Sequence, residues 1–78
     1  MSWNYRVVKR KIGCEVLLEI HEVYYDSDGS IESWTENSII PSGKTIEELK
    51  KDFSMQLLAF ELPILDYDQM VASLKNKN

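Results

Sequence analysis

The stretch that decides the fold is IHEVYYDSDGSIESWTE, residues 20–36. β-Branched and aromatic residues on both sides of Asp28-Gly29 suit the half-buried surface of a sheet. Asp-Gly closes turns well because glycine tolerates a positive φ. The stretch therefore predicts a β-hairpin with its turn at residues 26–29.

A further strand precedes this hairpin. Trp3, Tyr5 and Val7 alternate with Asn4 and Arg6, which is the period of a half-buried strand. A turn at residues 11–13 then leads into the hairpin. The pattern predicts strands over about residues 3–10, 14–25 and 30–37.

Glu22 breaks the alternation of the second strand. Strict alternation places its carboxylate on the core side, between Ile20 and Tyr24. A β-bulge near His21 would re-aim the residues that follow, and an end of the strand there would have the same effect. The pattern does not choose between these two alternatives.

A long amphipathic helix follows the strands. Thr45 and Glu48 have the spacing of a capping box, and Pro63 disfavours helical geometry at the residue before it. The helix is therefore expected over about residues 46–61. One apolar stripe of this helix is expected to pack on the sheet: Ile46, Leu49, Phe53, Leu57 and Phe60.

A second apolar stripe, Met55, Leu58 and Leu62, lies on nearly the opposite side of this helix and needs a cover. A short helix over about residues 67–74 could fold back and supply it, or a second copy of the protein could do so. The predicted fold is a single α+β domain spanning residues 1–78. It is a three-stranded antiparallel β-meander packed on one long amphipathic helix, with a short C-terminal helix.

The hairpin also predicts a contact surface. With a four-residue turn, His21 lies opposite Trp34, and both point away from the long helix. Tyr25 and Glu36 share that face. Aromatic residues dominate many binding surfaces, so we expect His21, Tyr25, Trp34 and Glu36 to form the binding site.

The sequence offers no catalytic set. Cys14 and His21 point to opposite faces of a regular strand, so no thiol–imidazole pair is expected. One histidine and one cysteine do not make a metal site. Residues 26–29 are acidic, but the flanking positions at which a calcium loop needs carboxylate ligands do not carry them. There is no glycine-rich phosphate loop. We expect a non-enzymatic protein without catalytic residues, metal or cofactor.

Charge is segregated within a net charge of −4. Residues 1–13 carry only basic charges and residues 14–36 only acidic ones. A basic first strand could bind nucleic acid, which is the alternative function. Charge pairing across neighbouring strands explains the same pattern, and the acidic total disfavours nucleic acid as a partner.

Length and composition favour a protein partner. A chain of 78 residues buries only roughly 60–65% of its unfolded surface, so a partner protein or a second copy would add stability. No apolar run reaches the ~20 residues of a membrane helix, and the first residues lack the apolar core of a secretory signal. The sequence predicts a cytoplasmic protein-interaction module that self-associates or binds another protein, without membrane contact.

Five segments carry a family resemblance: Trp3-Asn4-Tyr5-Arg6-Val7, His21-Glu22-Val23-Tyr24-Tyr25-Asp26, Trp34-Thr35-Glu36, Gly43-Lys44-Thr45-Ile46-Glu47-Glu48-Leu49 and Pro63-Ile64-Leu65-Asp66. Together they resemble a family of small uncharacterised bacterial proteins, which brings no function with it. More loosely, three strands followed by Gly-x-Thr-x-Glu-Glu and a helix are similar to HicB-type antitoxins, whose domain occupies a toxin. This chain lacks their Pro-Asp-Leu-Pro-Gly stretch. A HicB-like antitoxin is a further alternative function.

Overall fold

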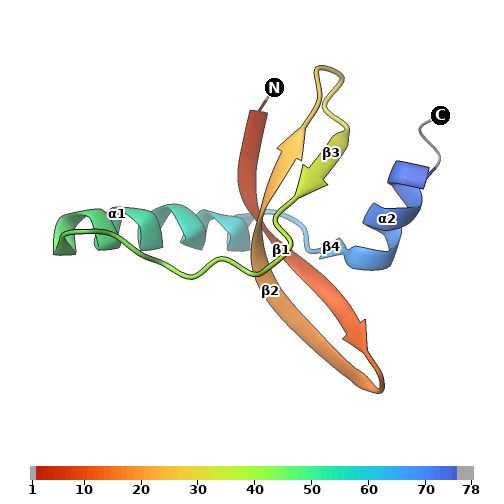
Figure 1. The fold of residues 1–78 in the computed structure, drawn as a ribbon, viewed down its shortest axis with the longest axis horizontal. Helices are drawn as coiled ribbons and strands as arrows, with labels where there is room; N and C mark the ends of the chain where they lie inside the picture. Colours follow the sequence, from red (N-terminus) through yellow and green to blue (C-terminus); the bar gives the residue numbers. More distant parts are fainter. Residues whose placement is uncertain (1, 76–78) are drawn as a thin grey trace.

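The computed structural model describes residues 2–75 and has an α+β fold (Figure 1). Its elements in chain order are the strands β1 (Ser2–Ile12), β2 (Glu15–Tyr25) and β3 (Ile31–Trp34), the helix α1 (Ile46–Leu57), the 3₁₀ helix η1 (Leu58–Glu61), the strand β4 (Leu65–Asp66) and the helix α2 (Tyr67–Lys75). The strands form one sheet in the order β3-β2-β1-β4, with β4 parallel to β1. The α+β class is confirmed, but the sheet has a short fourth strand that the sequence pattern did not reveal.

β1 and β2 form a long, regular hairpin. Their ladder runs without interruption from Ser2 opposite Tyr25 to Ile12 opposite Glu15, and the turn between them contains Gly13 at φ 63°. Neither a bulge nor a strand end occurs at Glu22. Its carboxylate stays on the α1 side of the sheet and accepts a hydrogen bond from the Tyr24 hydroxyl (2.9 Å).

β2 and β3 pair in a different register from the one expected. Val23 lies opposite Trp34 and Tyr25 opposite Ile31, which leaves Glu32 as an extra, bulged residue. The expected pairing of His21 with Trp34 is wrong by two positions. A shift of two residues preserves the face of a side chain, so Trp34 still lies on the His21 side of the sheet.

α2 covers the face of the sheet that was expected to carry no helix. Val8, Val23 and Met70 form the buried core there. The side chains packed around them are Tyr25, Ile31, Trp34, Leu65 and Tyr67. The rings of Trp34 and Tyr67 meet edge to face with centroids 5.9 Å apart. The short β4 carries the chain to this face, because it pairs with the outer edge of β1 and leads directly into α2.

α1 points away from the sheet instead of lying across it (Figure 1). As the capping box predicts, the side chain of Thr45 accepts a hydrogen bond from the backbone of Glu48 at its first turn. The expectation that its five-residue apolar stripe packs on the sheet is wrong, because these side chains are 36–65% exposed.

Polar contacts anchor α1 instead. The Asp52 carboxylate accepts hydrogen bonds from the Tyr5 hydroxyl (3.1 Å), the Ser42 backbone N–H (3.0 Å) and the Gln56 amide (3.2 Å). Gln56 and Ala59 are buried. At 3.6 residues per turn, Asp52, Gln56 and Ala59 fall within about 60° of helix surface, between the two apolar stripes. The helix therefore turns this narrow strip toward its own chain and leaves a stripe uncovered on either side.

Candidate interaction surface

The chain exposes more surface than a monomer of its size normally does. Its accessible surface is 5875 Å², whereas a monomeric protein of 9.1 kDa exposes about 4,900 Å². Its radius of gyration is 13.7 Å, against about 11.5 Å for a compact domain of this length. Figure 1 shows the cause: α1, the end of the β1–β2 hairpin and α2 project from the sheet in different directions.

The first part of the exposed surface is the α1 stripe, which we define as Ile46, Leu49, Phe53, Leu57 and Phe60. Its exposed fractions run from 36% at Leu49 to 65% at Phe60. A large patch of this kind on a small protein is typical of an interaction site. The second stripe, Met55, Leu58 and Leu62, lies on the other side of η1 and is also exposed.

The second part is the hairpin arm, which we define as residues 9–18, at the free end of β1 and β2. Val16 and Leu18 are 58% and 54% exposed, and alternation places them on the α1 side of the sheet. The ladder sets Lys11 opposite Val16 and Lys9 opposite Leu18. The expected cross-strand pairing of acids with bases is therefore wrong. On this face of the arm, the two lysines follow β1 and the two apolar side chains follow β2.

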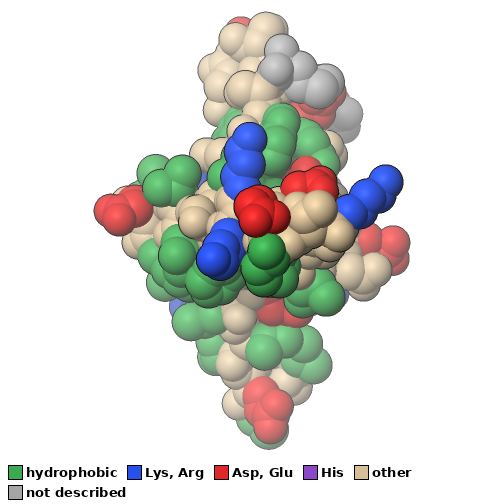
Figure 2. Space-filling view, turned by 90° about the vertical axis from the view of Figure 1, so that its left-hand side faces the viewer, with side chains coloured by type: hydrophobic (Ala, Val, Ile, Leu, Met, Phe, Trp, Pro, Cys, Tyr) green, Lys and Arg blue, Asp and Glu red, His purple; other side chains and the backbone are tan. Residues whose placement is uncertain are grey.

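Phe60, the last residue of the α1 stripe, and Leu18 of the hairpin arm line a common cavity of about 360 Å³. The rest of its lining includes Val7 and Ile20 of the sheet and Leu62, which follows η1. Figure 2 shows hydrophobic side chains gathered around the polar outer side of α1 and again over the arm. We call the α1 stripe, Val16, Leu18 and this cavity together the apolar corner.

The second stripe borders a separate cavity of about 350 Å³, whose lining includes Met55, Leu58 and Leu62 together with Trp3 and Tyr5 of β1. α2 lies on the opposite face of the sheet. Of the two alternatives for covering this stripe, the one in which the C-terminal helix folds back over it is therefore wrong. The stripe is open to a partner.

The residues expected to form the binding site are placed differently. His21 is only 4% exposed, and its Nδ1 lies 2.9 Å from the Thr35 carbonyl oxygen, so a proton on Nδ1 would donate to that oxygen. Its Nε2 lies 3.7 Å from a Glu19 carboxylate oxygen. The imidazole thus joins β2 to the segment after β3 and presents little surface to a partner.

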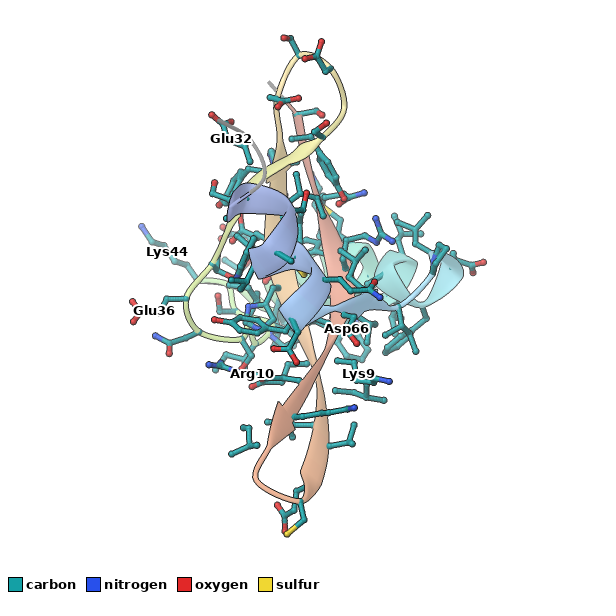
Figure 3. The ribbon with its side chains drawn as sticks, turned by 90° about the vertical axis from the view of Figure 1, so that its right-hand side faces the viewer. Lys9, Arg10, Glu32, Glu36, Lys44 and Asp66 are labelled. Atoms are coloured by element: carbon teal, nitrogen blue, oxygen red, sulfur yellow. The ribbon has the colours of Figure 1, made fainter. Side chains whose placement is uncertain are left out.

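Tyr25, Trp34 and Glu36 are not brought together as a surface. The Tyr25 hydroxyl donates to Asn4 (2.7 Å), and Trp34 packs against α2. Glu36 is exposed on the segment that follows β3, to one side of α2 in Figure 3. The shared face of His21, Tyr25 and Trp34 was predicted correctly, but it forms the core under α2.

The basic residues of β1 are divided between the two faces of the sheet. Arg6 donates to the Tyr25 hydroxyl (3.1 Å) and to the Pro63 carbonyl (2.7 Å), and the Arg10 guanidinium lies 4.4 Å from the centre of the Tyr67 ring. Lys9 points to the other side of β1 from Arg10 (Figure 3). The strand therefore does not present its basic residues as one phosphate-binding row.

A polar cleft of about 690 Å³ lies between α1 and the segment before it. Sequence patterns did not reveal it, because Tyr5, Glu22 and Asp52 come from three separate elements. Burial and the hydrogen bond to Asp52 raise the pKa of Tyr5 to about 12. At neutral pH its hydroxyl is therefore a protonated donor that fixes α1 to β1.

No family model, no curated protein and no solved structure matches the chain. Within residues 2–75, no group of three or more His, Cys, Asp or Glu side chains is arranged to hold a metal ion. Over the same residues, no helix is long and apolar enough to cross a membrane.

Proposed function

We propose that this protein is a small, non-enzymatic interaction module that binds another protein chain through the apolar corner. The observation that carries this proposal is the excess of about 1,000 Å² of accessible surface over that of a typical monomer of this mass. Each partner in a standard protein–protein interface buries roughly 800 Å². The excess is therefore of the size that one interface would cover.

The composition of the corner supports the same reading. Phe53 and Phe60 are large, rigid apolar side chains, and Lys9 and Lys11 lie in the arm, on the strand beside Leu18 and Val16. An apolar centre with a charged rim is the usual anatomy of a protein interface. The single cysteine, Cys14, is free and exposed, which suits a reducing compartment, and the cytoplasm is the proposed location.

Cross-linking inside the native cells tests the proposal. A tagged chain should be captured covalently with a second protein chain, and Phe53→Asp should abolish that product because it places a charge in the apolar corner. Ser54→Asp is the matched control, since it adds the same charge at the next position of α1, outside the stripe, and should leave the product intact. A wild-type chain that forms no cross-linked product would contradict the proposal.

A further inference from the structure

We infer that the partner protein adds an extended segment, as a further strand, to the open edge of β2 at residues 15–19. The segment carries a lysine or arginine at each end and apolar residues between them. This inference rests on the proposed function, because Val16 and Leu18 of this edge belong to the apolar corner. It names the chemistry of the chain that binds there.

The hydrogen bonds of β2 show which of its residues face the open edge. The backbone N–H of Thr35 donates to the Glu22 carbonyl oxygen (3.0 Å), and that of Ile39 donates to the Ile20 carbonyl oxygen (2.8 Å). Backbone groups of an antiparallel strand point alternately to its two neighbours. The even-numbered residues of β2 therefore direct their N–H and C=O groups away from β1.

Val16 and Leu18 are the even-numbered residues of the hairpin arm on β2. Within residues 2–75, no backbone group bonds to their outward N–H and C=O groups. The segment after β3 follows this edge only as far as Ile20, and the arm extends beyond it without a neighbouring strand (Figures 1 and 3). Unpaired groups at the spacing of a strand are matched by another extended chain. A helix does not match them, because its backbone groups bond to one another.

The side chains of this edge specify the residues that match it. Alternation places Glu15, Leu17 and Glu19 on one face of the sheet, and Val16 and Leu18 on the other. The three apolar side chains are 44–58% exposed. Among residues 2–75, no lysine or arginine forms an ion pair with either glutamate. Opposite charges stabilise a cross-strand pair, so basic residues fit opposite the two glutamates and apolar residues fit between them.

The same charges disfavour a second copy of this chain as the added strand. If two β2 edges paired antiparallel about Leu17, Glu15 of one copy would lie opposite Glu19 of the other. Like charges directly opposite each other destabilise a strand pair. Charged side chains on an edge protect it from pairing with itself. A basic segment of another protein meets the edge without this repulsion.

A labelled synthetic peptide, Gly-Ser-Lys-Val-Leu-Val-Lys-Ser-Gly, tests the inference by fluorescence anisotropy with the full-length chain. Antiparallel pairing about Leu17 sets its two lysines opposite Glu19 and Glu15, and directs the N–H groups of its two valines to β2. The peptide should bind with a Kd below about 1 mM. N-Methylation of either valine should weaken binding at least about tenfold. N-Methylation of the central leucine, whose N–H points away from β2, should leave binding unchanged.

Val16→Pro tests the edge from the side of the protein. It removes an outward N–H that β1 does not use, and proline is tolerated at such positions of an edge strand. The variant should keep its circular dichroism spectrum and bind the peptide about tenfold more weakly. Val16→Thr is the matched control, because it keeps both the N–H group and the β-branch, and its affinity should be close to that of the wild type.

A charge exchange keeps the test valid if Val16→Pro does not fold. Glu15→Lys, at the exposed end of the arm, should weaken binding of the peptide about fivefold, because it sets two lysines opposite each other. Glutamate in place of the second lysine of the peptide should restore the affinity for this variant. If it does not, the added strand does not lie antiparallel beside β2 and the inference is wrong.

The remaining outcomes separate this inference from the proposed function. No binding at about 1 mM peptide would overturn the inference, and so would equal effects of N-methylation at valine and at leucine. If Phe53→Asp abolishes the cross-linked product in cells but Val16→Pro leaves it intact, the apolar corner binds a protein and only strand addition is rejected. A wild-type chain that forms no product rejects the proposed function itself.

Discussion

At the scale of single residues, the side chains that the sequence indicates as a binding site mainly form contacts within the chain and stabilise the fold. Alternation along β2 places His21, Val23 and Tyr25 on one face, and this could be predicted from the sequence. The burial of that face could not, because no pattern in residues 62–66 indicates which face of the sheet the chain crosses to. His21 is therefore a structural residue in this fold.

His21→Ala should lower the free energy of unfolding by about 1–3 kcal/mol, because the substitution leaves the Thr35 carbonyl without its partner. Urea unfolding followed by circular dichroism measures the loss. Glu36→Ala is the control at an exposed position and should change the stability by less than about 0.5 kcal/mol. Equal effects of the two substitutions would show that the imidazole contact contributes nothing.

Tyr5 should make stability depend on pH in the alkaline range. Burial and Asp52 raise its pKa from 10.0 to about 12 in the folded chain, so folding favours the protonated hydroxyl. This contribution is fully present below pH 10 and is lost as the pH rises from 10 to about 12.

Tyr5→Phe isolates that contribution. The stability difference between the wild type and Tyr5→Phe should shrink across the same pH range, as measured by urea unfolding at each pH. The pKa of Tyr24 is also raised, by its hydrogen bond to Glu22, but Tyr24 is present in both proteins and cancels in the difference. A difference that stays constant up to pH 12 would contradict the role assigned to Tyr5.

At the scale of elements, the sequence predicts where helices and turns begin more reliably than it predicts how these elements pack. The capping box marks the start of α1, and Gly29 at φ 82° lies in the hairpin turn where Asp-Gly predicts it. The register of β3 differs from the expected one by two positions: the turn between Tyr25 and Ile31 is one residue longer than the four assumed, and the bulge at Glu32 adds the second. Neither leaves a trace in the alternation. The direction of α1 differs from the expected one because the helix packs through a narrow polar strip between its two apolar stripes. An apolar stripe is the usual sign of a packed face, so the pattern favours the wrong side.

Thr45→Ala should destabilise the protein by about 1 kcal/mol, since it removes the oxygen that accepts the Glu48 backbone N–H at the start of α1. Thermal unfolding at fixed protein concentration measures the change. Ser54→Ala in the exposed middle of the same helix is the control, and its higher helix propensity should leave the stability equal or slightly higher. A neutral Thr45→Ala would mean that the capping bond does not hold the helix start.

At the scale of the whole molecule, the open shape explains why a 78-residue chain carries so much apolar surface. The apolar content of α1 and of the arm could be read from the sequence, and so could the need for a cover. The corner that joins them could not, because it depends on the angle between two elements that are far apart in the chain. The interaction proposed for this chain would cover that exposed apolar surface.

The most direct test is photo-cross-linking in the native cells from a photo-reactive residue placed at position 53 or 60, inside the apolar corner. The account predicts a covalent product with a second protein chain from these two positions and none from position 54, which lies outside the stripe. Equal products from the three positions, or no product from any of them, would contradict it.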